Sequence, residues 1–271
     1  GAETIFLVGT YHLPDPRHEA MLAKVRPLLS SAAALLVEAG PEEEARLRSE
    51  VAQRPDFMMR PQGPTLPEML DEADWQAVAA EMRARGVPTV ITSRLRPWYV
   101  AMMLGIPPCA VDGVRRGEVG LDHRLIAEAQ ARGLPIRALE PYDTLFRMFG
   151  DLPPEGELDM VRAALVMADR PEDMTVTLAN AYFAGRSQML WDFTLERALA
   201  EPGADQADLT RQFDLMVDVL VTRRNRSWLP VLEDAARHGP VLAAFGALHL
   251  PGETGVLALL AGRGFAITPI P

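Results

Sequence analysis

Short, nearly uninterrupted apolar runs recur along the chain and alternate with segments of helical periodicity. Runs of this kind are typical of strands that are covered on both faces, because neither face then needs polar side chains. The runs predicted as strands are residues 4–8, 33–37, 89–91, 135–139, 241–245 and 265–268. Strands separated by helices indicate an α/β layered fold.

The helices between these runs are marked by capping residues and glycines. One helix is predicted from about Thr65, with Pro67 in its first turn, to Gly86. Another is predicted from Asp122, taken as its N-cap, to about residue 133, with His123 on the surface.

The segment from about residue 142 to 238 contains no convincing strand. Apolar side chains at helical spacing there are predicted to form a helix core or, alternatively, a methionine-lined groove for an extended ligand; they are Leu209, Phe213, Met216 and Leu220. We therefore expect one domain over residues 1–271, with a central mixed, largely parallel sheet, flanking helices and a helical insertion at about 142–238.

Four of the predicted strands lead into residues that can do chemistry. The first and the fifth both run into the phrase G-x-x-H-L-P, which contains His12 and His249, and two others end at Glu38 and Glu140. Ligands of α/β sheets bind outside the carboxyl ends of the strands. Either histidine alone could be an ordinary hydrogen-bonded loop residue. Because His12, His249, Glu38 and Glu140 all follow strand ends, they are predicted together to form one site.

Two histidines and two carboxylates suit a divalent metal with open coordination positions, or metal-free acid/base catalysis by histidine. The motifs H-E-x-x-H, G-x-S-x-G, G-x-x-x-x-G-K-[ST] and G-x-G-x-x-G are absent. Their absence argues against the usual zinc peptidase, serine hydrolase, P-loop NTPase and dinucleotide enzyme.

A further polar pair, Arg224 and Asn225, lies in the stretch TRRNRSWLP. Pro230 is predicted to break or restart a helix there, with Ser227 as its N-cap. The pair could hold a substrate carbonyl or carboxylate, or it could belong to a solvated basic patch at a helix end.

The amino-acid composition limits the classes of partner that can be expected. The formal net charge of −10 argues against a nucleic-acid partner, so a peptide or small-molecule substrate is expected. Cys109 is the only cysteine, which excludes an intrachain disulfide. No apolar run of roughly 18 residues is present, so no transmembrane segment is expected, and no signal peptide is visible.

Several stretches, in this order along the chain, resemble the TraB/GumN family, which includes the Tiki proteases. They are FLVGTYHLP, LLVEAG, GLDHRLIAEAQARGLPIRALEP, RRNRSWLPVLE and VLAAFGALHLPGETGVLALLAGRGFAI, whereas residues 41–108 match less. The resemblance implies an α/β fold with both G-x-x-H motifs at one active site.

The resemblance also implies a metal-dependent hydrolase, with a Tiki-like peptidase as the leading hypothesis and Mn, Co or Zn as the metal. His12 and His249 would bind the metal, Glu38 or Glu140 would complete the ligand set, and the other glutamate would be the general base. Arg224 and Asn225 would steady the substrate or the developing oxyanion.

Relatives in the wider superfamily include erythromycin esterases and a haem-binding group, which leaves two alternatives. One is a metal-free esterase-type hydrolase with His12 or His249 as the base, and the other is a non-catalytic peptide- or haem-binding regulatory protein. Because bacterial members are often exported, the resemblance implies a periplasmic or cell-envelope location, with the cytoplasm as the alternative.

Overall fold

The computed structural model describes residues 3–150, 152–168, 171–199 and 206–270. Its centre is one sheet in the order β1–β4–β2–β3, and every pairing in it is parallel. The strands are β1 (Ile5–Thr10), β2 (Ala34–Val37), β3 (Ile136–Ala138) and β4 (Val241–Gly246). The α/β class and the four strands with polar residues at their ends are confirmed.

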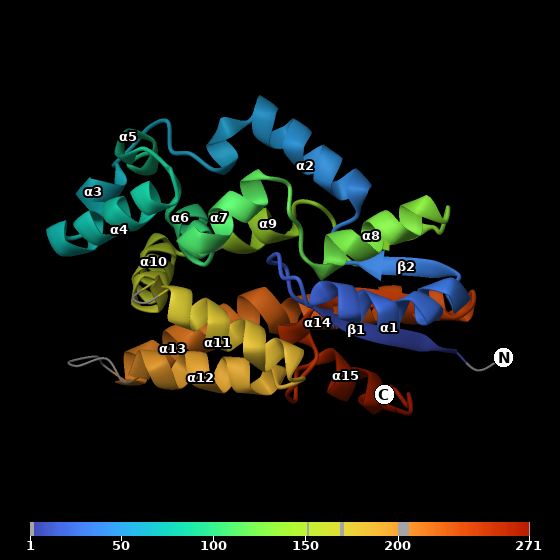
Figure 1. Ribbon diagram of the computed structural model, residues 1–271. Coiled ribbons are helices and arrows are strands. Elements are labelled where there is room, and N and C mark those ends of the chain that lie inside the picture. Colours follow the sequence, from blue (N-terminus) through green and yellow to red (C-terminus); the bar gives the residue numbers. More distant parts are fainter. Residues whose placement is uncertain (1–2, 151, 169–170, 200–205, 271) are drawn as a thin grey trace.

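Helices cover both faces of the sheet (Figure 1). Helices α1 (His18–Ser31) and α8 (Leu121–Ala131) pack on the face that contains Leu35 and Leu242. Helices α14 (Arg223–Arg237) and α15 (Val256–Gly262) pack on the opposite face, which contains Leu36 and Ala243. Neighbouring residues of β2 and β4 are buried on opposite faces, which explains why their sequences are apolar throughout.

The remaining helices lie beyond the carboxyl ends of the strands (Figure 1). One group follows β2: α2 (Pro41–Gln53), η1 (Pro55–Phe57), α3 (Leu66–Met69), α4 (Glu72–Ala84), α5 (Thr89–Thr92), α6 (Pro97–Leu104) and α7 (Pro108–Arg115). The other follows β3: α9 (Thr144–Gly150), α10 (Pro154–Ala168), α11 (Pro171–Phe183), α12 (Ser187–Leu199), α13 (Gln206–Val217) and the π-helical turn η2 (Asp218–Thr222). Both groups share one apolar core, in which Val78 and Val100 pack with Leu158 and Val161. The helical insertion predicted after residue 142 therefore has a helical counterpart after β2. Among the described residues, no helix has both the length and the hydropathy needed to cross a membrane.

Two predicted strands are wrong. Residues 89–91 belong to the short helix α5, in which the amide of Ile91 bonds to Pro88 O, and Val90 and Ile91 are exposed. Residues 265–268 pair with no strand, and the amide of Phe265 instead bonds to Leu260 O at the end of α15. At residues 89–91 local hydrogen bonds satisfy the backbone, and residues 266–268 are exposed, so neither run is placed in the sheet.

The helix boundaries also differ from expectation. The helix predicted from Thr65 is two helices, since Asp71 caps α4 by accepting a hydrogen bond from the amide of Asp74. Helix α14 continues through Pro230, and Ser227 lies inside it and donates to Arg224 O. The irregular turn is η2, immediately before Arg224 rather than after it.

Helix α8 begins closer to the first G-x-x-H phrase than the sequence indicated. Its N-cap is Gly120, not Asp122, and the amide of Leu121 donates to Tyr11 O at 3.1 Å. A Cβ atom on Gly120 would lie 2.4 Å from His12 O. This close approach needs a glycine, and it places Asp122 beside His12.

The contact of Gly120 with the His12 backbone gives a stability prediction. We expect Gly120→Ala to lower the free energy of unfolding by about 2 kcal/mol, because the added methyl group would overlap the backbone of His12, which cannot move away as a side chain could. Urea denaturation measures this, with Gly262→Ala as the control because a Cβ there meets nothing within 4 Å. Equal stability of the two variants would contradict the prediction.

Candidate functional site

The two G-x-x-H phrases lie side by side because β1 pairs with β4 along its whole length, Gly9 opposite Phe245. A Cβ atom on Gly9 would lie 2.9 Å from both Ala247 Cα and Leu250 Cδ1. The first glycine is therefore required for the second phrase to pack against the end of β1.

The glycine of the second phrase lets three polar side chains approach it closely. A Cβ atom on Gly246 would lie 3.0 Å from His12 Nε2, 3.3 Å from Glu38 Oε1 and 3.5 Å from His249 Cδ2. The amide of Gly246 donates to Glu38 Oε1 at 2.6 Å. His12, Glu38 and His249 thus surround one point at the carboxyl edge of the sheet, as their positions after three strands predicted.

A buried guanidinium joins these residues to Glu140. Arg224 Nε donates to both carboxylate oxygens of Glu140 at 2.9 and 3.1 Å, and Nη2 donates to Glu140 at 2.6 Å and to Glu38 at 2.5 Å. Arg224 Nη1 donates to Leu220 O at 3.1 Å and lies 3.3 Å from His249 Nε2. All five N–H groups of Arg224 therefore have protein acceptors, and the side chain is not part of a solvated patch.

Both glutamates are ion-paired, but they differ in exposure. Glu140 is buried, and its Oε2 also accepts a hydrogen bond from Trp228 Nε1 at 3.0 Å. Glu38 is partly exposed, and its pKa falls to about 2: burial alone would raise it, but the charge of Arg224 and the neighbouring His12 and His249 lower it. Glu38 is thus a carboxylate at neutral pH and the more exposed of the two glutamates.

His249 is held in one tautomer by Asn225. The amide nitrogen of Asn225 donates to His249 O at 3.2 Å and to Thr254 O at 2.9 Å, so its carbonyl oxygen accepts from His249 Nδ1 at 2.6 Å. The ring of His249 also packs against that of Trp228, with the ring centroids 4.5 Å apart and the planes tilted by 39°. Burial lowers the pKa of His249 to about 4, so its ring is neutral and enclosed.

His12 has a different environment. Its side chain is 56% exposed, with Nδ1 3.4 Å from Asp122 Oδ2 and Nε2 3.8 Å from Glu38 Oε1. Burial works against a charge on this ring, but the hydrogen bond to Asp122 and the negative charges of Glu38 and Asp122 outweigh it, and the pKa of His12 is raised. His12 is therefore the accessible, more basic histidine of the pair.

The helical insertion is hydrogen-bonded to both G-x-x-H phrases. The hydroxyl of Tyr182 in α11 donates to Gly9 O at 2.9 Å, and the indole N–H of Trp191 in α12 donates to Leu248 O at 3.3 Å. Each phrase thus receives one hydrogen bond from an aromatic side chain of the insertion.

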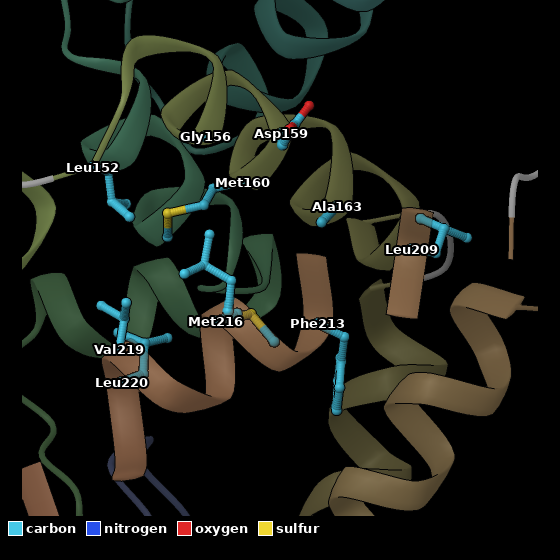
Figure 2. Close-up of a pocket in the computed structure, with 11 residues that line it drawn as sticks. Leu152, Gly156, Asp159, Met160, Ala163, Leu209, Phe213, Met216, Val219 and Leu220 are labelled. Atoms are coloured by element: carbon cyan, nitrogen blue, oxygen red, sulfur yellow. The ribbon is translucent and has the colours of Figure 1, made fainter. Parts of the chain in front are cut away.

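The pattern of apolar residues in α13 and η2 corresponds to a pocket of about 70 Å³ (Figure 2). Leu209, Phe213, Met216 and Leu220 line it, and Met160 of α10 faces them. The pocket adjoins the site, because Leu220 O accepts the hydrogen bond from Arg224.

The predicted metal ligands are arranged around the guanidinium of Arg224. His12 Nε2 and Glu38 Oε1 face the same space, but His249 Nε2 faces Arg224 Nη1. Among the described residues, no three His, Cys, Asp or Glu side chains are grouped so that they could hold a metal ion. A catalytic zinc centre uses three protein ligands, and in this structure the third predicted donor beside His12 and Glu38, His249 Nε2, lies 3.3 Å from Arg224 Nη1.

Sequence reasoning missed Asp122, Tyr182 and Trp191 as parts of the site. For Asp122 the glycine at position 120 was a usable signal, because a glycine N-cap places the aspartate inside the first turn rather than at the cap. No local pattern marks Tyr182 or Trp191, which reach the phrases only through tertiary packing.

The ion pairs of Arg224 give a second prediction. We expect Arg224→Met to lower the free energy of unfolding by about 3–5 kcal/mol, because it leaves two carboxylates without their cation. Arg223→Met is the matched control, since Arg223 is exposed and pairs with the exposed Asp218, an interaction worth about 0–1 kcal/mol. Similar losses in chemical denaturation of the two variants would contradict this account.

The lowered pKa of Glu38 gives a third prediction, on pH. A carboxyl whose pKa is lower in the folded than in the unfolded protein adds stability above pH 4.5, and this is lost as the pH falls toward 2. We expect the stability advantage of the wild type over Glu38→Gln to shrink by about 2 kcal/mol between pH 6 and pH 3. Urea denaturation across this range measures the difference, and a constant difference would contradict the assigned charge state.

Comparison with known proteins gives a family but no close relative. No curated protein and no solved structure matches the chain. The family model described as TraB/PrgY/gumN matches residues 1–269, a span that includes every residue of the site. The chain therefore belongs to the TraB/PrgY/gumN family.

Proposed function

We propose that the protein is a hydrolase of ester or amide bonds in peptides or small molecules, and that His12 is its general base. The observation that carries the proposal is the setting of His12: an accessible imidazole with Nδ1 3.4 Å from the Asp122 carboxylate and Nε2 3.8 Å from Glu38 Oε1. An imidazole oriented by a carboxylate is a common arrangement for moving a proton near neutral pH.

The proposed reaction uses a water molecule held near His12 Nε2 and Glu38. Nε2 takes a proton from the water as its oxygen attacks the substrate carbonyl carbon, and the carbonyl electron pair moves to oxygen. When the tetrahedral intermediate collapses, the leaving group departs with the proton from Nε2. Asp122 keeps the proton on Nδ1 throughout, and the carboxylate of Glu38 stabilises the transient imidazolium.

The other site residues are proposed to position these groups. Arg224 and Asn225 were predicted to steady the substrate, but their N–H groups are taken up by protein acceptors. These contacts support a role in fixing Glu38, Glu140 and His249. Both oxygens of Glu140 are bonded to Arg224 or Trp228, which favours a structural role over that of a base.

The metal-dependent peptidase that the resemblance implies is the second candidate. Family membership and the 3.8 Å between His12 Nε2 and Glu38 Oε1 favour it, since two donors at that separation can share a cation. A third ligand would require His249 to part from Arg224. Metal content therefore separates the two candidates.

The fourth prediction concerns activity. We expect His12→Gln to lower kcat/KM for ester or peptide hydrolysis by about 10²–10⁴-fold, because the general base is lost. The free energy of unfolding should change by only about 0.5 kcal/mol, since the side chain is exposed. His238→Gln, at an exposed position near the end of α14, is the control and should keep full activity.

The assay uses a series of p-nitrophenyl esters and a peptide library, with protein stripped by chelator and with added Mn²⁺, Co²⁺ or Zn²⁺. Unchanged turnover after chelation supports the metal-free proposal. Turnover that needs an added metal supports the second candidate and overturns the first. Absence of turnover on all substrates, with a peptide or haem bound stoichiometrically, would support the non-catalytic alternative.

A further inference from the structure

The side chain of Asp122 is held from one side only. Its Oδ1 is buried and has no hydrogen-bond partner in the described part of the chain. Its Oδ2 lies 3.4 Å from His12 Nδ1 and 3.0 Å from His123 Nδ1. The carboxylate that orients His12 is therefore itself held mainly by His123, which the sequence had placed as a surface residue.

His123 is in turn held by α2. Its Nε2 lies 2.9 Å from Glu44 Oε1, so the ring lies between two carboxylates. The hydrogen bond to Asp122, followed by the charges of Asp122 and Glu44, raises the pKa of His123 to about 9, and both ring nitrogens then donate.

These contacts form a ring that returns to the site. Helix α2 begins at Pro41, three residues after Glu38, and its first turns carry Glu44. The ring runs from Glu38 through the chain to Glu44, then through His123 and Asp122 to His12, whose Nε2 faces Glu38 again. Acidic and basic groups alternate along the four side-chain contacts from Glu44 to Glu38, so each contact joins opposite charges whenever both histidines are protonated.

We propose that His123, anchored by Glu44, is a positioning residue for the proposed general base: it fixes the Asp122 carboxylate so that Oδ2 keeps the proton of His12 on Nδ1. This inference rests on the proposed function. Its physical basis is that the hydrogen bond made by one ring nitrogen decides which tautomer a histidine adopts. Only the Nδ1–H tautomer leaves the lone pair of Nε2 free to accept a proton from water.

The test reads the tautomer of His12 directly by two-bond ¹H–¹⁵N spectra of histidine-labelled protein, at a pH where His12 is neutral. The chain has five histidines, so single variants assign every ring. We expect Nδ1–H for His12 in the wild type and a mixture of tautomers in His123→Leu. His123→Asn should restore Nδ1–H, because the asparagine amide can donate to Asp122 from nearly the position of Nδ1. Glu44→Gln, a milder change, should give an intermediate result.

Kinetics provide the second readout. We expect kcat to fall about tenfold in His123→Leu with KM unchanged, and to recover in His123→Asn. An unchanged His12 tautomer in both His123→Leu and Glu44→Gln would overturn the proposal. Because the spectra need no turnover, they also decide it if the protein proves to have no hydrolase activity, a result that would overturn the proposed function alone.

Discussion

The site depends on the burial of one cation, the guanidinium of Arg224. A charge in the interior is costly unless it is paired and fully hydrogen-bonded. Arg224 meets this requirement with the carboxylates of Glu38 and Glu140, the carbonyl of Leu220 and the ring of His249. One side chain thereby ties the ends of β2 and β3 to helix α14 and to the second G-x-x-H phrase. The π-helical turn η2, just before Arg224, directs Leu220 O at the guanidinium.

The repeated phrase gives two histidines with opposite properties. Both follow a strand and a glycine, yet the side chain of His12 is 56% exposed while His249 is buried. The carboxylates beside His12 raise its pKa, and the enclosure of His249 by Trp228 and Asn225 lowers its pKa. Groups whose environments separate their pKa values usually have different roles. The repetition therefore reflects the pairing of β1 with β4, and it does not make the two histidines equivalent.

The sequence was informative where the fold constrains residues locally. Strands covered on both faces must be apolar, and parallel strands bring their carboxyl ends to one edge, so His12, Glu38, Glu140 and His249 could be placed together without coordinates. Roles set by packing could not be predicted. Asp122 becomes a partner of His12 only because Gly120 lets α8 approach the chain so closely. The apolar run at 89–91 matched a strand in composition, but helix α5 satisfies its backbone locally.

The parts of the site differ in where they come from along the chain. Its charged side chains and histidines come from strand ends, α14 and the first turns of α2 and α8. The aromatic hydrogen-bond donors to both phrases come from α11 and α12. These charged groups are closely coupled, since a change in Arg224 affects two carboxylates and a histidine at once. Tyr182 contacts the first phrase through Gly9 O and by stacking on the ring of Tyr11, and Trp191 contacts the second phrase through Leu248 O. Helices α11 and α12 therefore supply hydrogen-bond donors and aromatic contacts to the two phrases, while the charged groups of the site come from other elements.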